Sequence, residues 1–246
     1  MSKTLKIDST SLALLLDKVQ ENTKNCRTLE QAAQLVTDAV YEELGDSVVL
    51  ARVFATVPFG ELPEPNRTFV TDLAAANDIA PLINNDTLIL SLLGTRGAKS
   101  EWNDRRTSQG HVGIPLASAA FVDKIPMISR LLKQVGLDLD WIDSRDADIV
   151  TKTLGGISGV FYVPDAAQAL DHQGRKIIPA QDFVEANDVK TVFGLAGGYP
   201  VGKMFVTVIV FCRETLDKAE AEFFSPLIDA FTANTASLAL TRAIFD

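Results

Sequence analysis

Residues 191–212, TVFGLAGGYPVGKMFVTVIVFC, restrict the fold more than any other part of the sequence. Two runs rich in β-branched and aromatic residues, which favour strands, flank AGGYPVGK, whose Gly and Pro residues are typical of a turn. The segment therefore predicts two strands joined by a long hairpin turn rather than a two-residue one. Strands joined in this way run antiparallel, which argues against a doubly wound parallel sheet.

Helical and strand patterns follow one another along the rest of the chain. Apolar residues at helical spacing predict helices over 9–22 and 28–44, the second begun by a capping box of Thr28 and Gln31. Further strands are predicted at 47–59, 86–97 and 159–166, and further helices near 68, at 125–135, within 178–190 and at 217–244, the last with a kink at Pro226. This order predicts a single α+β domain over 1–246, with a core of about 28–239 and a central antiparallel sheet flanked by helices.

Composition and charge disfavour several kinds of partner. The chain has 246 residues, 47% of them hydrophobic, and a formal net charge of −9 at pH 7, without a dense run of Lys and Arg. Phosphate backbones and anionic lipid surfaces attract clustered basic residues, so neither nucleic acid nor a membrane is expected as a partner. The longest apolar run, 204–212, is too short to span a bilayer, and the first residues lack the apolar core of a signal peptide. With two cysteines far apart in sequence, the protein is predicted to be cytoplasmic.

The polar stretch EWNDRRTSQGHVGIPL is the main candidate for a ligand site. Arg105 and Arg106 offer guanidinium groups to a carboxylate or phosphate, and Asp104 can orient one of them. Trp102 offers a flat apolar face, and His111 offers a hydrogen-bonding ring. In the alternative interpretation, Asp104 pairs with an adjacent arginine, Trp102 seals the loop onto the sheet, and His111 is a satisfied residue at the edge of the core. The sequence leaves both interpretations open.

Motifs for catalysis or metal binding are weak. No Gly-rich loop leads into a helix with a following Lys-Ser or Lys-Thr, and no GxSxG elbow occurs. Haem ligation by His111 or His172 rests on a lone histidine in each case. The acidic residues after Gly136 lack the glycine and closing Glu of an EF-hand, which favours a solvated surface over a divalent-metal site. No catalytic residue is predicted, and the cofactor is unknown.

The C-terminal third resembles the closing half of a GAF domain. Residues 189–232, VKTVFGLAGGYPVGKMFVTVIVFCRETLDKAEAEFFSPLIDAFT, have its order of strand, turn, strand and acid-capped helix. The helix at 28–44 leading into the first strand resembles the opening half, with TRG…WNDRR…S.GH…IPL between them. Over 28–239 the chain is similar to the sensory modules that precede bacterial histidine kinases and response regulators.

The resemblance implies a GAF- or PAS-like antiparallel sheet with helices on one face and a small-molecule pocket on the other. Tyr162 and Phe193, on predicted strands, would line that pocket together with the polar stretch. The terminal helices would pack together, form a homodimer and pass a signal to an output domain or kinase. The specialised signatures of the family are missing, because neither Cys26 nor Cys212 suits a bilin attachment or a redox pair, and the Asn-Lys-Phe…Asp-Glu pattern of cyclic-nucleotide binding is not found.

The expected function is therefore that of a non-catalytic sensory domain that binds a small molecule. Two alternatives remain at this level. In the first, the protein is an enzyme that acts on a small acidic substrate held by the paired arginines. In the second, it is a ligand-free dimerisation module whose terminal helices either form a bundle between two copies or only cover their own sheet. The last helix is expected to continue towards residue 244 and beyond.

Overall fold

The computed structural model describes residues 9–108, 110–144, 147–200 and 204–246, and a six-stranded antiparallel sheet forms its centre. The strands lie in the order β3-β2-β1-β6-β5-β4. Their bounds are β1 Val48–Pro58, β2 Leu88–Gly97, β3 Gly113–Pro115, β4 Ser158–Val163, β5 Thr191–Gly198 and β6 Phe205–Cys212. The predicted α+β class, with one antiparallel sheet flanked by helices, is confirmed.

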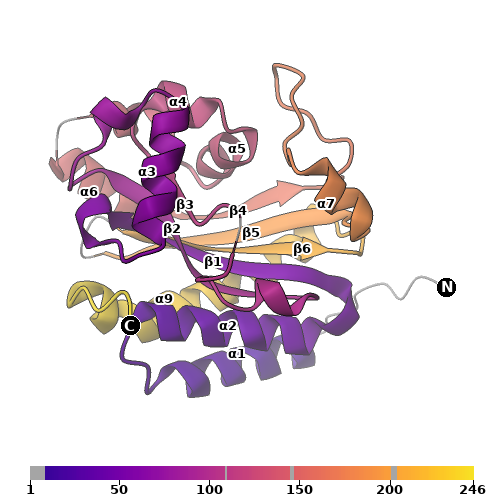
Figure 1. Ribbon diagram of the computed structural model, residues 1–246. Helices are drawn as coiled ribbons and strands as arrows, with labels where there is room; N and C mark the ends of the chain where they lie inside the picture. Colours follow the sequence, from indigo (N-terminus) through magenta and orange to yellow (C-terminus); the bar gives the residue numbers. More distant parts are fainter. Residues whose placement is uncertain (1–8, 109, 145–146, 201–203) are drawn as a thin grey trace.

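Helices cover both faces of this sheet (Figure 1). The first face is covered by α1 Ser9–Thr23, α2 Leu29–Leu44 and α9 Ser225–Leu240, with the short α8 Lys218–Glu222 before α9. The second face is covered by α3 Asn66–Ala76, α4 Ala119–Asp123, α5 Pro126–Gln134, α6 Ala147–Gly155 and α7 Gln181–Ala186. Helices on both faces differ from the expectation of helices on one face only, because the connections after β1, β3 and β4 each supply short helices. In the part of the chain that the structure describes, no helix is long and apolar enough to cross a membrane.

The hairpin predicted from residues 191–212 is confirmed as β5 and β6. Thr191 pairs with Cys212 at one end, and Gly198 pairs with Phe205 at the other. β6 then pairs with β1, which makes β1 and β6 the two central strands. Both strands are almost completely buried, as expected for strands covered on both faces.

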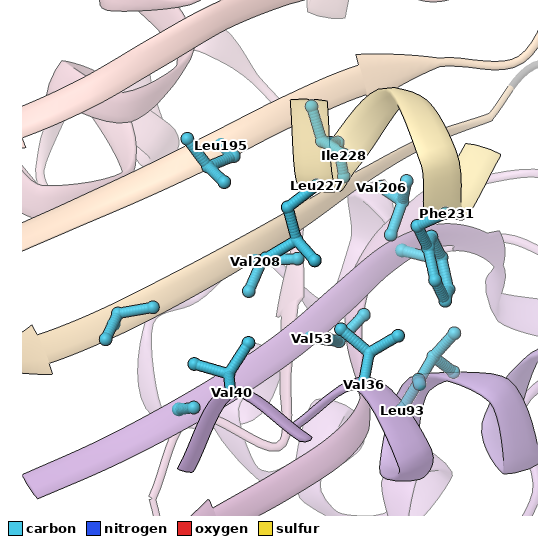
Figure 2. Close-up of a cluster of buried hydrophobic side chains, with 14 of the residues drawn as sticks. Val36, Val40, Val53, Leu93, Leu195, Val206, Val208, Leu227, Ile228 and Phe231 are labelled. Atoms are coloured by element: carbon cyan, nitrogen blue, oxygen red, sulfur yellow. The ribbon is translucent and has the colours of Figure 1, made fainter. Parts of the chain in front are cut away.

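The core between the sheet and the first helical layer is built mainly from aliphatic side chains, and Figure 2 shows part of it around Phe231. Val36 and Val40 reach it from α2, and Leu227 and Phe231 reach it from α9. The sheet approaches α2 closely at Gly94, where a Cβ atom would lie 2.5 Å from the carbonyl carbon of Ala33. A side chain at this position would therefore force the helix away from the sheet.

The terminal helices cover their own sheet. α1 packs against α2 and α9, and Phe231 of α9 is fully buried in the core of its own chain. Phe231 is therefore not available for a homodimer contact between terminal helices, because this side chain is enclosed by the protomer. Leu238 of the same helix is partly buried against the same core.

The C-terminal helix ends earlier than expected and does not run on. Pro226 lies in the first turn of α9 and separates it from α8, so the predicted kink is a restart. After Leu240 the chain reverses at Arg242, whose φ is +58°. The backbone N–H groups of Leu29 and Glu30, free at the start of α2, then donate to the carbonyl oxygens of Ala243 and Ile244 at 2.9 and 2.8 Å.

Two polar segments are more ordered than the sequence suggested. Within the stretch 101–116, residues 113–115 form the edge strand β3, which pairs with β2. In the acidic segment after Gly136, Leu139 and Trp141 are buried, so the acidic side chains alternate with core residues. Asp146 lies outside the described residues, as does the side chain of Asp148, and no group of His, Cys, Asp and Glu suited to a metal ion occurs in the described part.

Candidate functional site

The segment 98–112, which connects β2 to β3, serves two different parts of the molecule. It is fixed to the end of β2 by two hydrogen bonds, from Thr95 Oγ1 to the carbonyl oxygen of Trp102 at 2.8 Å and from the Gly97 N–H to Asn103 Oδ1 at 2.8 Å. Trp102 and His111 line an apolar cavity on the second face of the sheet. Arg105 and Arg106, by contrast, reach Glu30 at the start of α2.

Arg105 forms a buried ion pair. Its Nη2 lies 2.7 Å from Glu30 Oε2, and its Nη1 donates to Asn66 Oδ1 at 2.8 Å. The exposed fractions of the Arg105 and Glu30 side chains are 3% and 5%. The guanidinium also lies over the ring of Phe245, 5.1 Å from its centroid. This arginine therefore joins the start of α2, the start of α3 and the C-terminal segment.

Arg106 and Asp104 lie beside this pair at the surface. Arg106 Nη2 is 2.6 Å from Glu30 Oε1, so one buried carboxylate accepts from both arginines. Asp104 Oδ1 accepts the Arg106 N–H at 2.8 Å and lies 3.7 Å from Arg106 Nη1. These contacts agree with the alternative interpretation, in which Asp104 pairs with an adjacent arginine.

A polar cleft of about 560 Å³ borders these charged groups, between α2 and the segment 98–112. Its charged side chains are Glu30, Asp104, Arg105, Arg106 and Asp246. Asp246 Oδ1 accepts hydrogen bonds from Thr28 Oγ1 and Gln31 Nε2, both at 2.8 Å, and Glu30 holds both arginines. The charges in this cleft thus have partners within the protein.

Tyr162 and Phe193 lie on the first face of the sheet, away from the cavity that Trp102 and His111 line. The Tyr162 hydroxyl donates to the carbonyl oxygen of Leu216 at 2.6 Å. Burial, followed by the nearby carboxylates of Asp217 and Glu220, raises the pKa of this phenol. Phe193 is buried and stacks on Phe224, with ring centroids 5.1 Å apart. The structure therefore does not bring the seven predicted residues into one site.

The apolar cavity has a volume of about 210 Å³ and lies between the second face of the sheet and the helices α5 and α7. Its floor consists of side chains from the strands β1, β2, β3 and β6, and its walls come from α5, from the segment before α7, from α7 itself and from the segment 98–112. The lining residues are Leu50, Arg52, Phe54, Leu90, Trp102, Gly110, His111, Ile114, Met127, Ile128, Ile178, Pro179, Ala180, Phe183, Ile209 and Phe211. Pockets for drug-sized ligands typically measure ~300–1,000 Å³, so this cavity suits a smaller molecule and leaves no room for a haem.

The strand geometry explains why these floor residues come together. Leu50, Arg52 and Phe54 alternate along β1, so their side chains share one face of the sheet. On the neighbouring strand, Phe211 pairs with Leu50 and Ile209 pairs with Arg52. The cavity is closed on one side by rings from α7 and the segment 98–112. Phe183 lies 5.5 Å from both Trp102 and Phe211, measured between ring centroids.

Arg52 is the residue of this site that the sequence analysis missed. It is the one charged residue in β1, VVLARVFATVP, and that isolation in an apolar strand was the available signal. Its Nη1 donates to the carbonyl oxygen of Gly110 at 2.8 Å, and its Nη2 donates to Ser108 Oγ at 2.9 Å. Burial lowers the pKa of its guanidinium to about 10. A positive charge thus stands in an apolar cavity whose described lining residues include no carboxylate.

His111 stands at the mouth of the cavity. Its φ of +53° is in the left-handed region, which few residues other than glycine adopt, and its side chain is partly exposed to solvent. Loss of hydration, followed by the positive charge of Arg52, lowers the pKa of the ring below its usual value. The neutral imidazole is therefore favoured near pH 7. His172, the other histidine considered as a haem ligand, lies on an exposed turn and does not line this cavity.

Comparison with known proteins identifies the fold. No family model matches the chain, and no curated protein matches it. Among solved structures, a phycocyanobilin-bound GAF domain from a cyanobacterial phytochrome has a TM-score of 0.50 at 12% identity, over 94% of this chain and 96% of that chain. A phycoerythrobilin-bound GAF domain from a cyanobacterial phytochrome has a TM-score of 0.49 at 13% identity, over 94% and 97%. The GAF domain of an Acinetobacter phosphoenolpyruvate-protein phosphotransferase has a TM-score of 0.46 at 10% identity, over 94% and 95%. The chain has the GAF-domain fold, as the resemblance of residues 189–232 predicted.

Proposed function

We propose that this protein is a non-catalytic sensory domain that binds a small molecule in the apolar cavity on the second face of its sheet. The observation that carries the proposal is the cavity itself, about 210 Å³ in volume and lined by strands, by α5 and α7, and by the segment 98–112. Concave, mostly apolar sites with a few polar groups are the usual form of ligand pockets. Solved GAF domains described as bilin-bound give the fold a precedent for ligand binding.

The polar groups of the cavity favour binding over catalysis. Of the lining residues that the structure describes, Arg52, Trp102 and His111 have polar side chains. His111 could act as a base, but no hydroxyl, thiol, amine or carboxylate nucleophile stands beside it among the described lining residues. In the competing enzyme hypothesis, Arg105 and Arg106 hold an acidic substrate, but Glu30 accepts from both of them.

The segment 98–112 offers a route from the cavity to the ends of the chain. Trp102 and His111 line the cavity, whereas Arg105, between them in sequence, is joined to Glu30 and Phe245. A ligand that displaces Trp102 or His111 would therefore disturb the contact between α2 and the C-terminal segment. We propose that this contact carries the signal to an output domain or kinase.

We also propose a homodimer, with an interface on the outer surface of the terminal helices. Leu14 of α1 and Leu240 of α9 are 51% and 60% exposed, which makes them better candidates than Phe231. The variants Leu14→Glu and Leu240→Glu are expected to turn a dimer into a monomer without unfolding it. Light scattering on both variants measures this, and an unchanged mass would exclude these side chains from the interface.

Tryptophan fluorescence tests ligand binding, because only one of the two tryptophans lines the cavity. In a Trp141→Phe variant, where Trp102 alone emits, small neutral and charged aromatic compounds are titrated into the protein. We expect a saturable change in emission from at least one compound. A Trp102→Phe variant, where Trp141 alone emits, is the matched control and is expected to show no such change.

A variant that fills the cavity completes this test. Ala180 lies at the cavity wall and is exposed, so Ala180→Phe adds a ring there with little effect on the core. We expect this variant to lose the binding that the parent shows. If no compound binds saturably at millimolar concentration, or if Ala180→Phe binds as well as the parent, the cavity is not a ligand site.

A further inference from the structure

Arg52 places a positive charge in the apolar cavity, and none of the described lining residues supplies a negative partner. Its two hydrogen-bond acceptors, the carbonyl oxygen of Gly110 and the hydroxyl of Ser108, are both neutral. A guanidinium has five N–H hydrogens, so three of them have no acceptor among the described residues. No described carboxylate lies within ion-pair distance of Arg52.

Arg52 is partly buried, and the fully buried Arg105 shows how this chain pairs an enclosed guanidinium elsewhere. Arg105 is held by the Glu30 carboxylate at 2.7 Å and by the Asn66 side chain at 2.8 Å. Buried charges in proteins are usually paired in this way, because removing an ion from water without compensation is unfavourable. The lowered pKa of Arg52 has the same origin, since it reflects burial without a compensating carboxylate. Arg52 therefore lacks a counter-ion that Arg105 has.

We infer that the missing counter-ion is the ligand, and that the cavity binds a small organic monoanion with one carboxylate on an apolar body. The inference rests on the proposed function, because it names the chemical class of molecule that the same cavity takes. Arg52 pairs with the carboxylate, and the apolar body contacts Phe54, Phe183 and Ile209.

The charge and size of the ligand follow from the lining. Among the described lining residues Arg52 alone has a permanent charge, so one negative charge balances the site. His111 is favoured in its neutral form near pH 7 and adds no second positive charge. The volume of about 210 Å³ limits the apolar body to a single ring or a short chain.

The same contacts link the anion to the segment 98–112. Arg52 already binds Ser108 and Gly110, and Gly110 directly precedes His111 at the mouth of the cavity. A carboxylate at Arg52 competes with these neutral acceptors, so it changes how the guanidinium holds the segment. Binding of the carboxylate at Arg52 is thereby coupled to the position of the segment 98–112, which also carries Arg105.

A matched pair of probes tests this inference. 3-Phenylpropionate and 3-phenylpropanamide share one apolar body and differ in charge, and calorimetry measures the affinity of each for the wild-type protein. We expect the acid to bind at least about tenfold more tightly than the amide, the ratio that one charge-assisted hydrogen bond supplies. In Arg52→Gln this preference is expected to vanish, while the affinity for the amide stays within about twofold.

A control variant separates the local charge from the overall charge. Arg96→Gln removes a partly exposed guanidinium of β2 that does not line the cavity, and it is expected to keep the preference for the acid. The ratio measured on the wild-type protein needs no variant, so the test stands even if Arg52→Gln does not fold. Arg52→Lys, which keeps the charge, is then expected to retain a preference for the acid.

The outcomes distinguish the two proposals. If acid and amide bind equally and Ala180→Phe blocks both, the cavity is a ligand site but the inference about charge is overturned. The same holds if Arg52→Gln keeps the full preference for the acid. If neither probe binds the folded protein at millimolar concentration, the inference is overturned, and the wider set of compounds titrated against Trp102 then decides the proposed function.

Discussion

The buried pair of Arg105 and Glu30 allows a sharp test of whether these charges serve the fold or a ligand. Arg105→Met removes the contact with Glu30 at 2.7 Å and the hydrogen bond to Asn66 at 2.8 Å, and it leaves a carboxylate that is 5% exposed with one fewer cation. Methionine keeps an unbranched, apolar side chain over the Phe245 ring, so the change acts mainly on charge.

The expected loss of stability is large. Breaking a buried ion pair by removing one partner costs ~3–5 kcal/mol, because the remaining charge is left without compensation. Arg106 stays within 2.6 Å of the same carboxylate, so the lower end of that range, about 3 kcal/mol, is expected for Arg105→Met. For a chain of this size, 1 kcal/mol corresponds to ~2–4 °C, which gives a fall of roughly 6–12 °C in Tm.

A second substitution reverses part of this loss if the reasoning is right. Glu30→Gln in the Arg105→Met background removes the uncompensated charge and keeps an acceptor for Arg106 and for the Asp246 N–H. The double variant is expected to be about 1–2 kcal/mol more stable than Arg105→Met alone. Urea and thermal denaturation followed by circular dichroism, on the wild type, both single variants and the double variant, measure the coupling.

A small change in the free energy of unfolding would refute this reasoning. If Arg105→Met lowers the free energy of unfolding by less than about 1 kcal/mol, or if Glu30→Gln does not restore stability, the pair contributes little to the fold. The Arg105 guanidinium would then be free to hold an acidic ligand, as the sequence first suggested.

Three further perturbations test the fold and the cavity. Gly94→Ala places a Cβ atom 2.5 Å from the backbone of α2 and is expected to cost about 1–3 kcal/mol in urea denaturation, whereas Gly156→Ala, whose nearest neighbour would be 3.4 Å away, is the mild control. Burial raises the pKa of both thiols, but Cys26 is partly exposed and Cys212 is fully enclosed, so a thiol reagent should modify the first in native protein and the second only in urea. The pKa of His111 is lower in the folded protein than in the unfolded chain, so the unfolded chain binds this proton more readily. The contribution of His111 to the free energy of unfolding is therefore complete above pH 6.5 and decreases as the pH falls below that value. Urea midpoints at pH 7 and pH 5.5 should therefore differ less in His111→Gln than in the wild type, and equal differences would contradict the assigned shift.

Most of the secondary structure was accessible from sequence because its causes are local. The hairpin at 191–212 follows from strand-forming runs on either side of a Gly- and Pro-containing turn, and α2 follows from its cap and apolar stripe. The cap predicted at Thr28 is present, with its Oγ1 accepting the Gln31 N–H at 3.2 Å. The end of the last helix could not be predicted from the sequence. It depends on hydrogen bonds from α2 to Ala243 and Ile244, and α2 lies about 210 positions earlier in the chain.

The candidate site was accessible only in part. Trp102 and His111 line the cavity that the structure shows, whereas Tyr162 and Phe193 lie on the opposite face of the sheet. Alternation along a strand fixes which residues share a face, but the pattern does not say which face holds the cavity when both faces are buried. Arg52 was missed because a single arginine in an apolar strand shows its role only once its surroundings are known.

The sequence by itself determined most of the helices and strands and the antiparallel hairpin of β5 and β6, since capping, periodicity and turn chemistry act between residues close together in the chain. The tertiary structure decided the role of each arginine, because that role depends on the partner of the side chain and the partner lies far away in sequence. Glu30 and Arg105 are 75 positions apart, and their contact turns a predicted ligand residue into part of the core. Arg52 and Ser108 are 56 positions apart, and folding places Arg52 in apolar surroundings where no described carboxylate pairs with it.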